Sequence, residues 1–250
     1  YDCSLRGREL LLGNPKNRGT FEQAKASFLK AIKLDPNYAQ AYAGLGFAYM
    51  FDYQNRWSDD PDGSLPLAKR YAEQAIEKNP KEPLARAVAA VAATFNGDLD
   101  RAQSEISIAL SLNPNLAMAY NISGTIRMYA GQPLEAIPLM ERAMRLDPAA
   151  NTQYLHFLGM ANLLAGKYET TAALFKQRIA LVPGTDFSRS ALVSALGHLG
   201  EVDEARLVWR ELMEINPKYS FSEHLSRLPF KRKEDAQRLA DGLAKAGLLN

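Results

Sequence analysis

The residues of this sequence that could carry out chemistry are few and widely separated. The chain has three histidines, His156, His198 and His224, and one cysteine, Cys3. The histidines lack the short spacing with which neighbouring residues present two ligands to one zinc ion. A single cysteine excludes both an intramolecular disulfide and a multi-cysteine metal centre. We therefore expect no metal site in these 250 residues.

Motifs for phosphate binding and nucleophilic catalysis are also missing. Gly166-Lys167 resembles the end of a P-loop, but Tyr168 stands where the magnesium-binding Ser or Thr belongs, and no glycine lies five residues before Gly166. Neither His-Glu-x-x-His nor Gly-x-Ser-x-Gly occurs in the sequence. The acidic residues are spread along the chain, and no pair stands out as a candidate acid and base. The sequence therefore predicts no catalytic residue and no cofactor.

Composition narrows the possible partners. Thirty Lys and Arg residues balance twenty-eight Asp and Glu residues, so the net charge of +2 does not indicate a nucleic-acid-binding surface. Runs of apolar or small residues, such as 87–93, are far shorter than the ~20 residues that cross a bilayer. We expect neither a nucleic-acid partner nor membrane contact by this region. The chain begins with Tyr1 instead of Met, so we expect a piece of a longer cytoplasmic protein, whose other parts could include a membrane tether.

The elements that would position any binding residues repeat along the chain. Six prolines follow one another at intervals of 44, 34, 34, 35 and 34 residues, and five of them come after Asp or Asn. This is a 34-residue period with one expansion. The prolines are Pro36, Pro80, Pro114, Pro148, Pro183 and Pro217.

Each period has internal structure. A glycine stands seventeen residues before every one of these prolines, and a small residue stands twelve before it, as in Gly131 and Ala136 before Pro148. Apolar residues between them recur every three or four positions, which is typical of an amphipathic helix. The glycine can end a preceding helix in the left-handed conformation, and the proline ends the following one. The repeating unit is therefore predicted to be two helices joined by a tight turn.

This spacing resembles the tetratricopeptide repeat (TPR), whose motif is clearest in Tyr120, Gly124, Gly131, Ala136 and Pro148. The resemblance implies an all-α fold, a right-handed α-α superhelix of about six helix-turn-helix repeats with the first helix of each pair lining a concave face. We expect the repeats over residues 1–217, followed by C-terminal capping helices at 218–250. The expected units are 1–36, 37–80 with an insertion at 51–66, 81–114, 115–148, 149–183 and 184–217.

The insertion allows two interpretations. Pro, Gly, Ser and Asp make its second half a predicted loop, yet it also contains Phe51, Tyr53 and Trp57. In the first interpretation, the preceding helix is extended and Trp57 packs against the repeats. In the second, the segment protrudes to bind a partner, with Tyr53 and Trp57 as accessory contacts.

The concave face is where the resemblance places binding, and its predicted lining is neutral or apolar. Such a surface suits an amphipathic helix or an extended apolar segment of a protein partner, because thioethers adapt to irregular surfaces. Alternatively, neighbouring helices or the chain's own tail fill part of the groove. The predicted groove residues are Phe47, Met50, Val91, Met118, Asn121, Met128, His156, Met160 and Ser194.

Several stretches also resemble the C-terminal repeat region of bacterial, notably rhizobial, class III adenylate/guanylate cyclases. They are Tyr1-Asp2, Leu5 to Leu11, Trp57 to Pro61, Tyr154 to Gly159, Leu228 to Lys231, and Asp241 to Leu248. The resemblance implies a catalytic domain before residue 1 and a regulatory or scaffolding role for this chain. That role would involve its own cyclase domain, self-association or another protein. The same region follows DNA-binding domains in some bacterial regulators, so a sensor module of a transcriptional regulator is the alternative.

Overall fold

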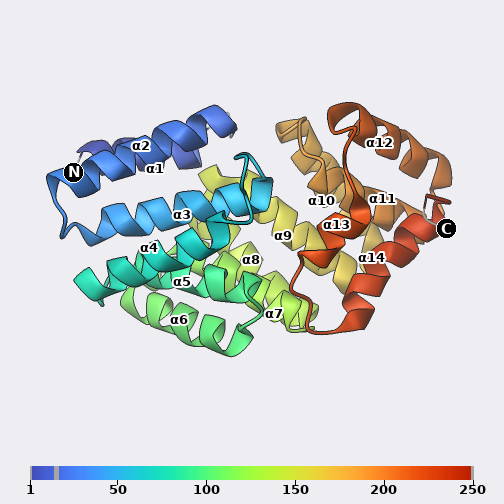
Figure 1. Ribbon diagram of the computed structural model, residues 1–250. Coiled ribbons are helices and arrows are strands. Elements are labelled where there is room, and N and C mark those ends of the chain that lie inside the picture. Colours follow the sequence, from blue (N-terminus) through green and yellow to red (C-terminus); the bar gives the residue numbers. More distant parts are fainter. Residues whose placement is uncertain (1, 14–16, 249–250) are drawn as a thin grey trace. The chain divides into compact units, whose positions relative to one another are not determined.

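Helices form the regular structure of the part of the chain that the computed structural model describes, residues 2–13 and 17–248, and no strand occurs there. The predicted all-α class is therefore confirmed. The chain divides into an N-terminal unit, residues 1–122, and a C-terminal unit, residues 123–250. The elements (Figure 1) are α1 (Asp2–Leu12), α2 (Arg18–Leu34), α3 (Ala39–Asn55), α4 (Ser64–Lys78), α5 (Pro83–Phe95), α6 (Leu99–Leu112), α7 (Ala117–Tyr129), α8 (Pro133–Leu146), the 3-10 turn η1 (Pro148–Ala150), α9 (Asn151–Leu164), α10 (Tyr168–Leu181), α11 (Phe187–Leu199), α12 (Val202–Ile215), α13 (Phe221–Ser226) and α14 (Lys233–Lys245).

The predicted helix-ending glycines behave differently along the chain. Gly97, Gly131, Gly166 and Gly200 have φ between 76° and 83°, the left-handed conformation that glycine adopts without steric cost. Gly63, in contrast, has a φ of −64° and caps the start of α4. The left-handed turn is missing there because the insertion, and not a tight turn, joins α3 to α4.

Close packing between the helices of a pair explains the small and large residues of the repeat. The small residues at the predicted contact, such as Ala24, Ala102 and Ala136, are fully buried. The large residue one turn later lies directly on a glycine of a neighbouring helix. A Cβ atom added to Gly159 would lie 2.8 Å from the Phe175 ring, and one added to Gly124 would lie 2.8 Å from Met140. Glycine on one helix thus makes room for a large side chain on the other.

The predicted insertion is part helix and part loop. Helix α3 continues to Asn55 and ends at Arg56, which takes the left-handed conformation with φ 55°. The chain then turns through residues 57–63 before α4 begins at Ser64.

After Pro217, the described residues contain two helices, α13 and α14. Helix α14 packs mainly on α11 and also touches α9. No helix in the described ranges is long and apolar enough to span a membrane.

Candidate interaction surface

The predicted groove residues of the N-terminal unit are mostly hidden from solvent. Met50 is 1% exposed, Asn121 4%, Val91 6% and Phe47 9%. Met118, near the start of α7, is partly exposed. The Phe47 ring lies 4.6 Å from the ring of Phe51 one turn later on α3. Binding of a partner by these side chains stays a prediction, and Met118 is the most accessible of the five.

In the C-terminal unit, the predicted residues are also largely buried. Met128 and Ser194 are fully buried and Met160 is 4% exposed, whereas His156 is partly exposed. Ser194 lies under the chain's own α14, since its hydroxyl donates a hydrogen bond of 3.0 Å to the carbonyl oxygen of Leu239. At this position the C-terminal segment occupies the surface that was predicted to receive a partner.

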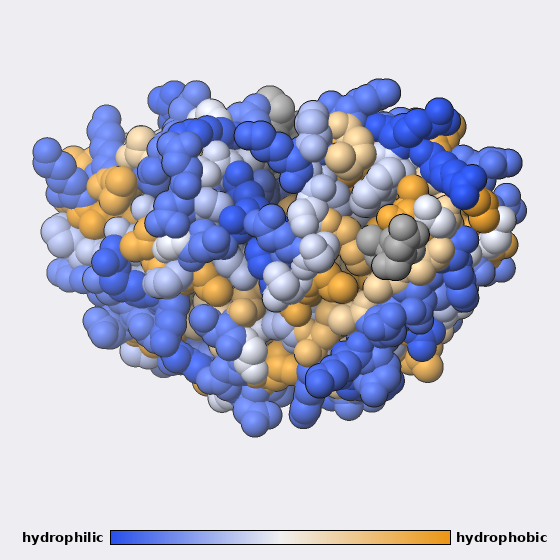
Figure 2. Space-filling view, turned by 45° about the vertical axis from the view of Figure 1, so that its right-hand side comes forward, coloured by the Kyte–Doolittle hydropathy of each residue, from blue (hydrophilic) through white to orange (hydrophobic). Residues whose placement is uncertain are grey.

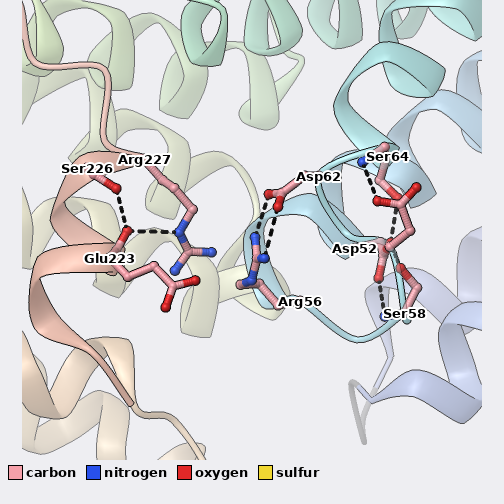
Figure 3. A network of polar contacts seen from close by, with 10 residues as sticks. Asp52, Arg56, Ser58, Asp62, Ser64, Glu223, Ser226 and Arg227 are labelled. Carbon is pink, nitrogen blue, oxygen red and sulfur yellow. Dashed lines mark hydrogen bonds and ion pairs between the residues drawn. The ribbon is translucent and has the colours of Figure 1, made fainter. Parts of the chain in front are cut away.

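A buried carboxylate organises the insertion. Asp52, on α3, has no exposed surface, and its Oδ1 accepts a hydrogen bond of 2.7 Å from the backbone N–H of Ser58. Its Oδ2 accepts hydrogen bonds from the hydroxyl groups of Ser58 and Ser64. Figure 3 shows Asp52 between these two serines, with Arg56 paired to both oxygens of Asp62 at 2.7 and 3.1 Å nearby. One carboxylate therefore closes the loop at both ends, and we call this arrangement the Asp52 clasp.

Aromatic side chains also hold the same segment against the repeats. The Trp57 ring lies 6.2 Å from Phe21 on α2 and 6.5 Å from Phe51 on α3, and the Tyr53 ring lies 5.5 Å from Phe95 on α5. Both predicted accessory residues are partly exposed. Their contacts match the interpretation in which the insertion packs against the repeats, and their binding role stays a prediction.

A polar cluster around Arg178, on α10, is the main feature that sequence reasoning missed. Arg178 Nε donates a hydrogen bond of 2.8 Å to the carbonyl oxygen of Thr152, and Nη1 donates to the hydroxyls of Thr185 and Ser188. Burial lowers the pKa of Arg178 to about 10. The sequence carried one signal for it, because alanine occupies the equivalent position in the first four units.

Two histidines lie beside this cluster. His156 Nδ1 is 3.2 Å from the Ser188 hydroxyl, and burial, with Arg178 close by, lowers the pKa of His156 well below its usual range. His224, on α13, lies 2.7 Å from the Tyr219 hydroxyl and 4.5 Å from the Phe187 ring, and burial lowers its pKa to about 3. Both imidazoles are therefore neutral at pH 7. At the C-terminal end of α13, the Glu223 carbonyl oxygen accepts hydrogen bonds from Ser226 Oγ and from Nε of Arg227, the residue that follows the helix (Figure 3).

The third histidine binds α14. His198 Nε2 lies 2.8 Å from the carbonyl oxygen of Arg238, and Nδ1 lies 3.1 Å from Nζ of Lys245. Its ring stacks on Tyr168 at 4.3 Å. Burial lowers the pKa of His198, and the positive charge of Lys245 acts in the same direction. A neutral imidazole can donate to the carbonyl and accept from the ammonium group at the same time.

These clusters do not form a metal site. No group of three or more His, Cys, Asp or Glu side chains among the described residues could hold a metal ion. Hydrophilic residues cover most of the face drawn in Figure 2, and hydrophobic residues form smaller patches between them. The contacts described above are packing and hydrogen-bond contacts within the chain.

Comparisons with known proteins agree with this fold. A model of the TPR repeat matches residues 17–50. A protein of Rhizobium meliloti (strain 1021) assigned as adenylate cyclase 3 is 34% identical over 103 residues, which are 41% of this chain and 17% of that protein. The chain spans between 17% and 30% of the length of three curated relatives that it matches.

Solved structures support the same conclusion. The Cut9–Hcn1 hetero-tetramer of the APC/C matches 97% of this chain and 46% of its own chain, with a TM-score of 0.67 and 14% identity. YrrB, a TPR protein with an unusual peptide-binding site, matches 80% of this chain and 98% of its own, with a TM-score of 0.50 and 18% identity. The described residues therefore have the all-helical fold of tetratricopeptide-repeat proteins.

Proposed function

We propose that this chain is a non-catalytic protein-interaction module and that it forms the regulatory or scaffolding region of a bacterial class III adenylate cyclase. The observation that carries the cyclase assignment is the 34% identity with the Rhizobium meliloti protein, together with the stretches quoted above. The interaction role is supported by the repeat match and by the helix-on-helix surfaces of the fold. The module would act in the cytoplasm, without contacting nucleic acid or membrane.

In this proposal, the module binds a peptide or helix of a protein partner, associates with a second copy, or contacts its own cyclase domain. Any of these events would change cyclase activity by favouring one arrangement of the catalytic domains over another. Among the predicted groove residues, Met118 and His156 are partly exposed and the others are buried, so these two are the best places to probe this coupling.

The test uses the full-length protein from which this chain derives. We expect upstream metal-binding aspartates, cyclic AMP production by the full-length protein and none by the 250-residue chain. Met118→Glu should change cyclic AMP production at least severalfold, while Glu77→Ala, an exposed control on α4, should not. Turnover by the isolated chain would disprove the non-catalytic role. A basic DNA-recognition helix upstream would replace the cyclase assignment with the transcriptional-regulator alternative.

A further inference from the structure

The turn between α5 and α6 contains the one asparagine of the sequence that is followed by glycine. Asn96 caps the end of α5 with φ −82° and ψ 0°, and Gly97 takes the left-handed conformation with φ 78°. The other asparagines precede proline or a residue larger than glycine, or end the sequence. Alanine or leucine stands before the left-handed glycines of the other repeat turns, Gly131, Gly166 and Gly200. This turn therefore carries a carboxamide that the equivalent turns lack.

An asparagine next to glycine can react with its own backbone. When the backbone nitrogen of Gly97 attacks Cγ of Asn96, a new N–Cγ bond forms, the Cγ–Nδ2 bond breaks, and ammonia leaves with the amide proton. Water then opens the cyclic succinimide. Cleavage of the new N–Cγ bond gives aspartate, whereas cleavage between the nitrogen and the backbone carbonyl carbon gives isoaspartate. Asparagine is for this reason one of the thermolabile residues of proteins.

The surroundings of this pair leave room for the ring. Asn96 and Gly97 are both exposed to solvent. A Cβ atom added to Gly97 would have no atom within 4 Å other than those of its chain neighbours. Glycine has no side chain to shield its own nitrogen, and its backbone angles change at little steric cost. Ring closure therefore displaces no packed side chain.

Hydrogen bonds of the closed turn occupy both reacting groups. The backbone N–H of Gly97 donates to the Thr94 carbonyl oxygen at 3.0 Å. Nδ2 of Asn96 donates to the Ala92 carbonyl oxygen, also at 3.0 Å. Both bonds must break before the nitrogen can reach Cγ. Helix ends open locally at a much lower free energy than the whole fold, so the reaction follows opening of the α5–α6 turn.

Either product changes the end of α5. A carboxylate oxygen in the place of Nδ2 cannot donate to the Ala92 carbonyl and repels it. The new negative charge also lies at the negative end of the dipole of α5, two residues before Asp98. Isoaspartate adds one carbon to the main chain, which changes the spacing of the backbone hydrogen bonds at Gly97. Both products therefore loosen the connection between α5 and α6.

We propose that Asn96 is a modification site, at which the exposed Asn96–Gly97 pair converts to aspartate or isoaspartate after opening of the α5–α6 turn, with water as the co-reactant. The reaction is irreversible because ammonia is lost to the solvent, so the altered fraction rises with the age of the protein. This inference goes beyond the proposed interaction role and does not depend on it.

Ageing of the wild-type 250-residue chain is the first test. The folded chain is incubated at mildly alkaline pH, and every asparagine is followed by peptide mapping with mass spectrometry that separates aspartate from isoaspartate. Asn96 should convert while the other asparagines do not. A synthetic peptide of residues 91–101, which lacks the folded turn, should react severalfold faster. No conversion of Asn96 by the time the peptide has reacted completely, or equal conversion of another asparagine, would overturn the site.

Two matched variants test the dependence on turn opening. Asp98 caps the start of α6, where its Oδ1 accepts a hydrogen bond of 3.1 Å from the backbone N–H of Arg101. Asp98→Ala removes this cap and should speed conversion of Asn96 roughly fivefold. Asp100→Ala removes the same charge from an exposed position within α6 and should leave the rate unchanged. Equal rates in the two variants would overturn the requirement for turn opening.

Hydrogen exchange measures the consequence of the modification. Asn96→Asp reproduces the aspartate product in every molecule, and Asn96→Ala removes the same side-chain hydrogen bond without adding charge. The amides of residues 92–99 should exchange severalfold faster in Asn96→Asp than in Asn96→Ala. Equal exchange would overturn the loosening of the turn. None of these measurements involves cyclic AMP, so failure here leaves the cyclase assignment intact.

Discussion

The two units stabilise their irregular segments with different chemical groups. In the N-terminal unit a carboxylate holds the insertion, whereas in the C-terminal unit imidazole, guanidinium and hydroxyl groups hold the α10–α11 connection and the C-terminal segment. In the first, Asp52 collects hydrogen bonds from Ser58 and Ser64. In the second, Arg178 fastens the α10–α11 connection, His198 binds α14, and His224 of the C-terminal segment packs on Phe187 of α11.

This difference predicts how each unit responds to acid. All three histidines of the chain lie in the C-terminal unit. Each has a pKa below its ordinary value in the folded protein. Protonation of each imidazole is therefore less favourable in the folded protein than in the unfolded chain. The two units should therefore differ in their stability at mildly acidic pH.

The largest effect is expected when the Asp52 clasp is removed. Asp52→Ala leaves three donors of the insertion without their acceptor, and we expect the free energy of unfolding of the N-terminal unit to fall by about 4 kcal/mol. Hydrogen exchange resolved by peptide should show faster exchange in α3 and α4. Glu77→Ala is the control at an exposed site. Unchanged exchange in residues 52–64 would mean that the aromatic contacts alone hold the insertion.

Acidification should sharpen the contrast between the units. Between an ordinary histidine pKa of about 6.5 and the lower folded values, the unfolded chain binds more protons, so stability falls as pH falls. His224 should lower the stability of the C-terminal unit by roughly 1 kcal/mol between pH 7.5 and 5.5, and His156 should add a loss of the same sign. Asp235 acts in the opposite direction, because burial raises its pKa. Urea unfolding followed by hydrogen exchange at both pH values measures the effect, and equal losses in both units would contradict it.

A loss of similar size is expected when Arg178 is replaced by alanine, the residue usual at its position in the first four units. Arg178→Ala leaves the Thr152 carbonyl and the Thr185 and Ser188 hydroxyls without this donor and should destabilise the C-terminal unit by about 2 kcal/mol. It should also raise the pKa of His156, because a nearby positive charge is removed. An NMR titration of His156 measures the shift, and a lower pKa would contradict this account.

The smallest effect is expected at the surface of the N-terminal unit. Arg18 and Asp59 form a two-bond ion pair at 2.7 and 2.8 Å, yet both side chains are largely exposed. Solvent and salt screen such pairs, so Arg18→Ala should leave the midpoint of urea unfolding within experimental scatter. A shift as large as that of Asp52→Ala would show that the insertion depends on its surface charges.

Local patterns predicted the helices because helix ends depend on nearby residues. Proline and glycine at fixed positions indicated where the helices end. Ala136 indicated a position where paired helices pack closely, and it is fully buried in the structure. The exact course of the groove was harder to predict. Periodicity identifies an apolar face but not what covers it, so burial of Met128 and Ser194 was not apparent.

Contacts between residues far apart in the sequence were hard to predict from the sequence. Arg178 broke an alanine pattern, and Gly242 placed a poor helix former inside a predicted helix. Each was a departure whose partner, Ser188 or Ser194, could be found only in three dimensions. The Asp52 clasp had no such signal, since its three bonds join residues that follow no repeat.

The Asp52 clasp also makes the insertion a practical attachment point for labels. Ser58 and Ser64 both bind the Asp52 carboxylate, so the loop between them has its two ends held at a fixed distance. Lengthening a closed surface loop costs little entropy, growing only with the logarithm of its length. A fluorophore-bearing or epitope sequence placed after Asp60 would therefore report on this module while its helices stay in place.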